Sequence, residues 1–192
     1  MPNGLALPLL VLLATEPPAP APLANGSFKA EMNGRTIHYE VHGRGPVLMT
    51  LTNSWGLTLD GLRGLYRPLE ERLTLVYFDP RGMGASAPAR TDADRGMAAV
   101  REDFDALRRH LKIGKANAIG WSNGAMNLQL LASEHPETIE SAIFLHGVAS
   151  YAREDMEAFA KKFPEMTARF TAFQQELADP KLSDDERTAR QK

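Results

Sequence analysis

The sequence predicts an α/β fold with a mostly parallel sheet, and three observations support this prediction. Short apolar runs of strand length alternate with segments whose apolar residues recur every three or four positions, which is typical of strands alternating with helices. An antiparallel N-terminal hairpin is expected where two strand-like segments meet at Asn33-Gly34. The later apolar runs are nearly continuous, as in parallel strands covered on both faces.

The predicted elements up to the middle of the chain begin with this hairpin, residues 27–43, because Asn and Gly both adopt the positive φ of a type I′ turn. A turn at 43–46 leads into a third strand, VLMTLT, residues 47–52. Apolar residues at helical spacing predict a helix around 62–69, with Leu62, Leu65, Tyr66 and Leu69 on its packed face. The run LTLVYFD, residues 73–79, predicts a buried parallel strand.

Helix and strand continue to alternate in the second half. Apolar positions between 97 and 111 predict a helix, and ANAIG, residues 116–120, predicts a short strand. A further helical face is expected from Met126, Leu130 and Leu131, followed by a buried strand at SAIFLHG, residues 141–147. Only helical spacing follows from Tyr151, with Pro164 at a first helical position.

Residues 1–26 form a leader that differs from the rest of the chain. Its apolar run, residues 5–14, is too short to cross a bilayer, which takes about 20 residues. Small residues and a Pro/Ala stretch follow, so the leader resembles a secretory signal and predicts a periplasmic or secreted protein. The alternative is a disordered leader on a cytoplasmic protein, because no Lys or Arg precedes the apolar run. We expect residues 27–150 to form the globular part and 151–192 a helical segment.

Composition narrows the class of partner. The 192 residues carry a formal net charge of −2, and positive and negative side chains are interspersed. Nucleic acids and anionic membranes require a concentrated basic surface, so neither is expected as the main partner, and no stable membrane anchor is predicted. A small-molecule partner is expected. The absence of cysteine excludes disulfides, thiolate nucleophiles and cysteine metal sites.

Ser122 stands in the pentapeptide Gly120-Trp121-Ser122-Asn123-Gly124, which fits the G-x-S-x-G pattern. A strand is predicted before it and a helix after it, the context in which a strained turn lifts a serine hydroxyl above the end of a sheet. Small flanking residues are needed because neighbouring backbone comes close. Ser122 is therefore predicted to be a nucleophile, the alternative being an ordinary helix N-cap.

The segment from Gly34 to Ser150 resembles the α/β-hydrolase family, in particular its proline iminopeptidase-like and ester-cleaving members. Three features occur in the family's order: a strand leading into the loop Thr52–Gly56, the segment DPRGMGAS at Asp79–Ser86, and the serine turn. The resemblance implies an α/β-hydrolase fold whose helical cap begins near residue 151. Asp79 and Arg81 are expected to hold their loop rather than to take part in chemistry.

The resemblance also implies an oxyanion hole. The N–H of Asn123, directly after the nucleophile, is the expected first donor, and the N–H of Ser54 or Trp55 the second. Many family members have His-Gly where this chain has Thr-Asn-Ser, so the choice between Ser54 and Trp55 stays open. Trp121 is expected either to line the acyl pocket, as Trp55 would, or to pack in the core.

No histidine is an obvious base for Ser122. Four lie in the hairpin or at helix ends: His38, His42, His110 and His135. His146 ends the strand that follows the serine helix and is expected at the same sheet edge. In the family the base follows the last strand, so we interpret His146 as a pocket-wall residue. The resemblance thus implies a C-terminally truncated hydrolase, without the last strands, the triad acid and the histidine, and an inactive fragment.

The predicted function is a serine hydrolase that cleaves an ester or amide bond of a small molecule through an acyl-enzyme on Ser122, with no metal and no organic cofactor. Two alternatives remain. The first is a scaffold that binds a small ligand without catalysis. The second is a dinucleotide-binding protein, because Gly82 to Ala87 also fits G-x-G-x-x-A after a strand. Pro88 follows this segment directly, whereas a dinucleotide fold begins its helix within the glycines.

Overall fold

The computed structural model describes residues 22–52, 57–147 and 153–177, and several residues between 179 and 189. The chain starts with an antiparallel hairpin of β1 (Gly26–Met32) and β2 (Arg35–Gly43). Asn33 and Gly34 have φ of 50° and 70°, as a type I′ turn requires. The predicted hairpin is confirmed, whereas nearly all of the predicted leader lies outside the described residues.

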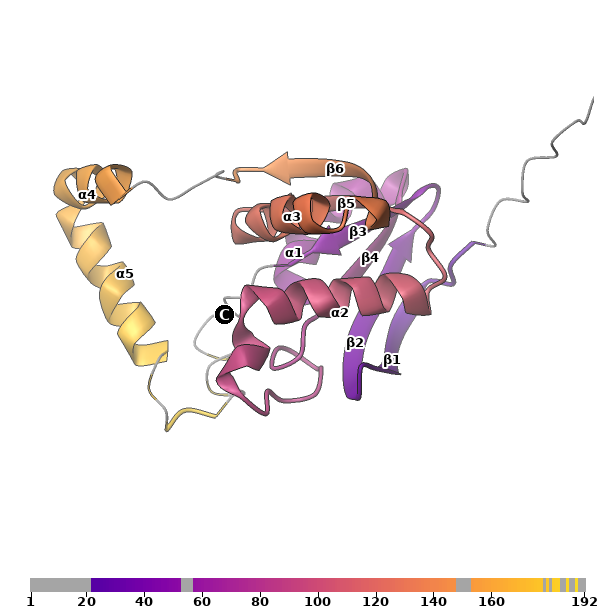
Figure 1. The fold of residues 1–192 in the computed structure, drawn as a ribbon, viewed down its shortest axis with the longest axis horizontal. Helices are drawn as coiled ribbons and strands as arrows, with labels where there is room; N and C mark the ends of the chain where they lie inside the picture. Colours follow the sequence, from indigo (N-terminus) through magenta and orange to yellow (C-terminus); the bar gives the residue numbers. More distant parts are fainter. Residues whose placement is uncertain are drawn as a thin grey trace, which may run out of the picture.

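Four parallel strands extend the hairpin into one six-stranded sheet of order β1-β2-β4-β3-β5-β6 (Figure 1). They are β3 (Val47–Leu51), β4 (Thr74–Asp79), β5 (Ala116–Trp121) and β6 (Ile139–Leu145). β2 joins the parallel strands by antiparallel pairing with β4. The carboxyl ends of β4, β3, β5 and β6 therefore meet at one edge of the sheet.

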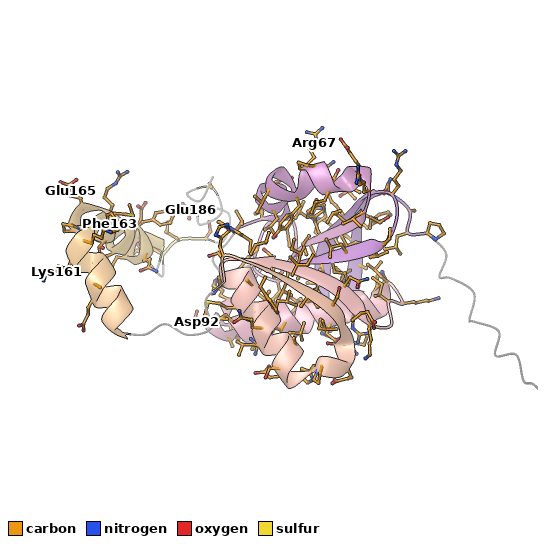
Figure 2. All side chains as sticks on the ribbon, turned by 90° about the horizontal axis from the view of Figure 1, so that it is seen from above. Arg67, Asp92, Lys161, Phe163, Glu165 and Glu186 are labelled. Atoms are coloured by element: carbon orange, nitrogen blue, oxygen red, sulfur yellow. The ribbon has the colours of Figure 1, made fainter. Side chains whose placement is uncertain are left out.

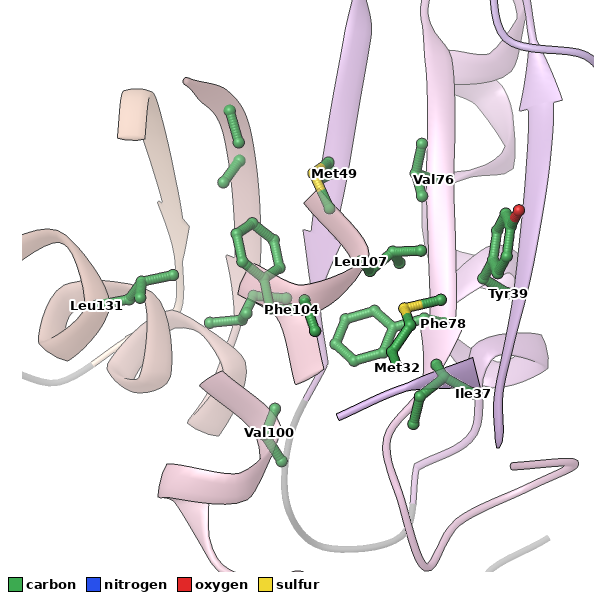
Figure 3. Close-up of a cluster of buried hydrophobic side chains, with 14 of the residues drawn as sticks. Met32, Ile37, Tyr39, Met49, Val76, Phe78, Val100, Phe104, Leu107 and Leu131 are labelled. Atoms are coloured by element: carbon green, nitrogen blue, oxygen red, sulfur yellow. The ribbon is translucent and has the colours of Figure 1, made fainter. Parts of the chain in front are cut away.

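Helices cover both faces of this sheet. The helices α2 (Met97–His110) and α3 (Asn123–Glu134) pack on one face, over a core that includes Phe78, Phe104 and Leu107 (Figure 3). On the other face, α1 (Leu59–Tyr66) packs on Leu48, Leu75, Tyr77 and Ile119. Full burial of a side chain such as Phe104 contributes about 1.5–3 kcal/mol, so these two clusters hold the three layers together.

Short 3₁₀ helices complete the connections: η1 (Arg67–Glu71), η2 (Asp92–Arg95) and η3 (Pro136–Thr138). Arg67 stands out from the surface of the first of these (Figure 2). Beyond residue 152, α4 (Arg153–Lys162) and α5 (Pro164–Leu177) pack against each other and lie apart from the sheet in Figure 1. α5 begins at Pro164, as the sequence predicts.

The predicted burial of the last strand is wrong. β6 is the outermost strand of the described sheet, and Ile143 and Phe144 are each 44% exposed. Apolar side chains on both faces of β6 make its sequence resemble that of a central strand. Among the described residues, however, only β5 pairs with β6, on one side of it.

The packed faces of two helices also differ from the prediction. In α3 the buried apolar positions are Ala125, Leu128 and Leu131, whereas Leu130 is exposed. In the first helix Leu65 is exposed, and the predicted face ends at Tyr66 because the chain tightens into η1. A spacing of three or four residues fits two neighbouring faces of a helix, and packing selects between them.

Candidate active site

Ser122 lies at the carboxyl edge of the sheet, directly after β5. The last residues of β5 and β6, Trp121 and Leu145, are paired in register, and the Ser122 N–H donates to the Leu145 carbonyl at 2.8 Å. His146 follows Leu145 and so lies at the same edge, as the sequence predicts. The turn that carries the serine is thus tied to the neighbouring strand.

The backbone of Ser122 has a conformation that few residues other than glycine adopt. Its φ is 53° and its ψ is −121°, outside the helix and strand regions. Such a conformation costs about 1–3 kcal/mol and persists only where the surroundings enforce it. Ser122 occupies the N-cap position of α3, but its hydroxyl makes no capping hydrogen bond, so the structure does not support a simple N-cap role.

The two glycines of the pentapeptide are required by close backbone contacts. A Cβ on Gly120 would lie 2.4 Å from the carbonyl oxygen of Gly124. A Cβ on Gly124 would lie 2.3 Å from the carbonyl oxygen of Leu51, at the end of β3. The first turn of α3 therefore presses against β5 on one side and β3 on the other, which holds Ser122 in its strained conformation.

Asn123 begins α3 immediately after the serine. The N–H groups of a helix's first turn point outward along its axis, and its positive dipole end favours negative charge there. The Asn123 side chain is buried, its amide lies 3.8 Å from the Met97 sulfur, and its Oδ1 accepts from Asn127 at 3.4 Å. The sequence pattern did not indicate Asn127 as a residue of this site. It is fully buried, and its Oδ1 has no hydrogen-bond partner among the described residues.

The remaining predicted site residues divide into three cases. Trp121 is half-buried and packs on the α1-side cluster, which agrees with the core interpretation; a pocket role stays a prediction. His146 is exposed with φ of 51°, and its imidazole makes no hydrogen bond to any described residue. Ser54 and Trp55 lie outside the described residues, between Thr52 and Leu57, where the Thr52 hydroxyl donates to the Leu57 carbonyl at 3.1 Å.

Asp79 holds together the segments around the end of β4. Its carboxylate, 2% exposed, accepts the N–H of Leu59 at 2.8 Å and the N–H of Ala85 at 3.0 Å. Nδ1 of the His38 imidazole lies 2.9 Å from Asp79 Oδ2, the oxygen that also accepts from Ala85. The expected loop-holding role of Asp79 is confirmed.

Arg81 anchors the same loop to α2. It forms a bidentate ion pair with the fully buried Asp103, which raises the Arg81 pKa because the hydrogen bond stabilises the charged guanidinium. Asp94, in η2, pairs with Arg35 at 2.8 Å. The backbone N–H of Arg90 lowers the Asp94 pKa most; burial opposes this, and the Thr91 N–H, Arg35 and Arg81 reinforce it.

The segment Gly82–Ala87 is not the start of a helix. The Gly82 N–H donates to the Ala87 carbonyl and the Ser86 N–H to the Met83 carbonyl, so the segment forms consecutive turns. Helical structure resumes only at Asp92. A dinucleotide fold places the pyrophosphate at a helix that begins within the glycines, so this alternative is wrong for the described geometry.

Other candidate sites in the described part of the chain are few. A depression of about 730 Å³, near Gly43, Arg67 and Glu70, lies at the amino ends of the parallel strands, far from Ser122. No group of three or more His, Asp or Glu side chains among these residues is placed to hold a metal ion. None of the helices in the described ranges has the length and apolar character needed to span a membrane.

Comparison with known proteins agrees with this geometry. Residues 48–189 match the family described as alpha/beta hydrolase fold. The chain is 30% identical over 144 residues to the mouse serine hydrolase BPHL and 29% identical over 146 residues to the proline iminopeptidase of Xanthomonas citri. These alignments cover 73% and 74% of this chain but 49% and 45% of the relatives, so the chain spans about half their length.

Solved structures show the same fold. An α/β fold family hydrolase from Bacillus anthracis matches with a TM-score of 0.65 and 21% identity, over 87% of this chain and 60% of the other. An epoxide hydrolase from Vigna radiata matches with a TM-score of 0.59 and 22% identity, over 70% of this chain and 46% of the other.

Proposed function

Because the chain belongs to the α/β-hydrolase fold family, we propose that it is a serine hydrolase that cleaves an ester or amide bond of a small molecule through an acyl-enzyme on Ser122. The observation that carries the proposal is the strained backbone of Ser122, held between two glycines that no larger residue can replace without a clash. Strain of this kind is typical of functional positions. The relatives named as a serine hydrolase and a proline iminopeptidase support the same chemistry.

In the proposed acylation step the Ser122 Oγ attacks the carbonyl carbon of the substrate, and a negative charge develops on the carbonyl oxygen. The Asn123 N–H, at the N-terminus of α3, is the proposed donor to this oxyanion, and Ser54 or Trp55 the second. One such donor contributes about 3 kcal/mol, because it is aimed at charge that appears only in the transition state. Trp121 and His146 are proposed to line the pocket.

Deprotonation of Ser122 needs a general base. His38, although paired with a carboxylate, is on β2, and the order β2-β4-β3-β5 places it three strand spacings, about 14 Å, from β5. His146 lies at the same sheet edge as Ser122 but has no orienting hydrogen-bond partner among the described residues, so we propose a pocket-wall role for it. Residual acceleration of about 10³–10⁴ over water survives in triads stripped of their members, and it comes from the oxyanion hole and substrate binding. Labelling of Ser122 in this chain therefore reports on the oxyanion donors and the position of the serine, and we expect it to be slower than labelling with a base in place.

The proposal is tested by incubating the folded chain with a fluorophosphonate probe and mapping the adduct by peptide mass spectrometry. We expect an adduct on Ser122 that Ser122→Ala removes. Ser133→Ala, on the exposed side of the same helix, is the matched control and should leave the adduct unchanged. A folded chain without any adduct on Ser122 would contradict the proposal and favour the alternative, a scaffold that binds a small ligand without catalysis.

A further inference from the structure

A second serine has an imidazole as its hydrogen-bond partner. The Ser27 Oγ lies 2.9 Å from Nε2 of His38, and Nδ1 of the same ring lies 2.9 Å from Oδ2 of Asp79. The three residues are on β1, β2 and β4, which are consecutive in the sheet, and His38 and Asp79 are directly opposite in register. Hydroxyl, imidazole and carboxylate thus form one hydrogen-bonded row across three strands.

The carboxylate end of this row is buried and held by several hydrogen bonds. Asp79 accepts two backbone N–H groups, from Leu59 and Ala85, in addition to the imidazole. A carboxylate that only accepts fixes the proton of a neutral imidazole on Nδ1. Nε2 is then an acceptor, and the Ser27 hydroxyl donates to it. This is the arrangement in which an imidazole can take a serine proton.

Two other charged residues lie near His38: Lys29 is directly opposite it in register on β1, and Glu40 is two positions along β2. Glu40 Oε1 lies 3.9 Å from Nε2 of His38, farther away than Ser27. The same carboxylate contacts His42 at 2.7 Å and Arg63 at 3.8 Å. Arg63 offsets part of the charge of Glu40, and Glu40 lies farther from Nε2 than the Ser27 hydroxyl does.

Ser27 is also accessible to a reactant. It is exposed on β1, the edge strand at the hairpin end of the described sheet. The side chain of His38 is 12% exposed, and that of Asp79 3%. The row therefore runs from a solvent-facing nucleophile to a buried acid.

We propose that Ser27 is a second activated serine, which takes up an acyl or phosphonyl group from an activated ester or fluorophosphonate independently of Ser122. The Ser27 Oγ bonds to the carbonyl carbon or phosphorus, the bond to the leaving group breaks, and the hydroxyl proton passes to Nε2 of His38. Ser27 lies within a strand, without the helix N-terminus that follows Ser122. Loss of a single oxyanion donor costs about 10²–10³ in rate, so we expect stoichiometric modification rather than turnover.

The test uses the full chain carrying Ser122→Ala, treated with a fluorophosphonate probe and mapped by peptide mass spectrometry. An adduct on Ser27 is expected. Ser141 is the internal control, because it is an exposed strand serine whose hydroxyl donates to the neutral amide of Asn117 at 2.8 Å instead of to an imidazole. We expect Ser141 to stay unmodified.

Two further measurements identify the imidazole as the activating group. His38→Gln should slow Ser27 labelling by about 100-fold or more, the contribution typical of a general base, and a thermal melt checks that the variant is folded. Should this variant fail to fold, His38→Asn provides the same measurement, because its amide also lacks a basic nitrogen. An absent Ser27 adduct, equal labelling of Ser27 and Ser141, or unchanged labelling of Ser27 in a folded His38 variant would each overturn the proposal. Because Ser122 and Ser27 adducts are mapped separately, failure of one leaves the other intact.

Discussion

Gly124→Ala should destabilise the fold, although the same change in most helices stabilises it. Glycine within a helix is less favourable than alanine by about 0.5–1 kcal/mol. At position 124 the new Cβ would lie 2.3 Å from the Leu51 carbonyl oxygen, whereas non-bonded atoms prefer about 3.5 Å. α3 and β3 must then separate by about 1 Å, and overpacking of this kind costs about 1–3 kcal/mol. The clash exceeds the gain in propensity, so we expect a net loss of about 1–2 kcal/mol.

The matched control is Gly64→Ala in α1, where nothing lies within 4 Å of the added Cβ. This change should raise the free energy of unfolding by about 0.5–1 kcal/mol. Urea unfolding of both variants, followed by circular dichroism, gives the two signs directly. In the Gly124→Ala variant the displaced first turn of α3 should also slow fluorophosphonate labelling of Ser122, since a shift of 1 Å can reduce the rate about 100-fold. If Gly124→Ala stabilises the chain as much as Gly64→Ala does, the close approach of α3 to β3 is wrong.

Two further predictions concern strain and charge. Ser122→Gly should raise the free energy of unfolding by about 1 kcal/mol, because glycine adopts a φ of 53° without strain. The same change should abolish the adduct at this position. A loss of stability in urea unfolding would argue against strain at the serine. Asp94→Asn should cost about 2 kcal/mol at pH 7, as charged hydrogen bonds are lost. The pKa of Asp94 is lower in the folded chain than in the unfolded chain, where it is about 3.9. The stability that the ionised carboxylate contributes is therefore complete at pH values above the unfolded-state pKa, and it disappears as the pH falls through the folded-state pKa. Urea unfolding at pH 7 and near pH 2 should therefore show a smaller cost at the acidic pH, and equal costs would exclude an ionised Asp94 as the cause.

Elements governed by local chemistry were predictable from the sequence. The turn at Asn33-Gly34 and the helix start at Pro164 depend on backbone preferences of the residues themselves. The serine turn was predictable in part, because the contact that requires Gly120 lies within the pentapeptide itself. The contact of Gly124 with Leu51 on β3 joins distant segments and was not.

Interactions between distant segments were not predictable. His38 was set aside because it lies in the hairpin, yet the pairing of β2 with β4 brings it to Asp79, 41 positions away. The ion pair between Arg81 and Asp103 likewise depends on how α2 crosses the sheet. Burial of Phe144 was overestimated, since apolar composition does not reveal whether a strand has neighbours on both sides.

The hydrogen bond from the Ser122 N–H to the Leu145 carbonyl ties the serine to the outermost strand of the described sheet. Strands at an edge open locally at a lower free energy than strands in the centre, because fewer pairings must be broken. When the end of β6 frays, the hydroxyl loses one of the constraints on its direction, even though the core beneath α2 and α3 stays intact. The fraction of time for which the nucleophile is well aimed therefore depends on how often the end of β6 opens. A molecule that pairs with the side of β6 on which no described residue lies would increase this fraction.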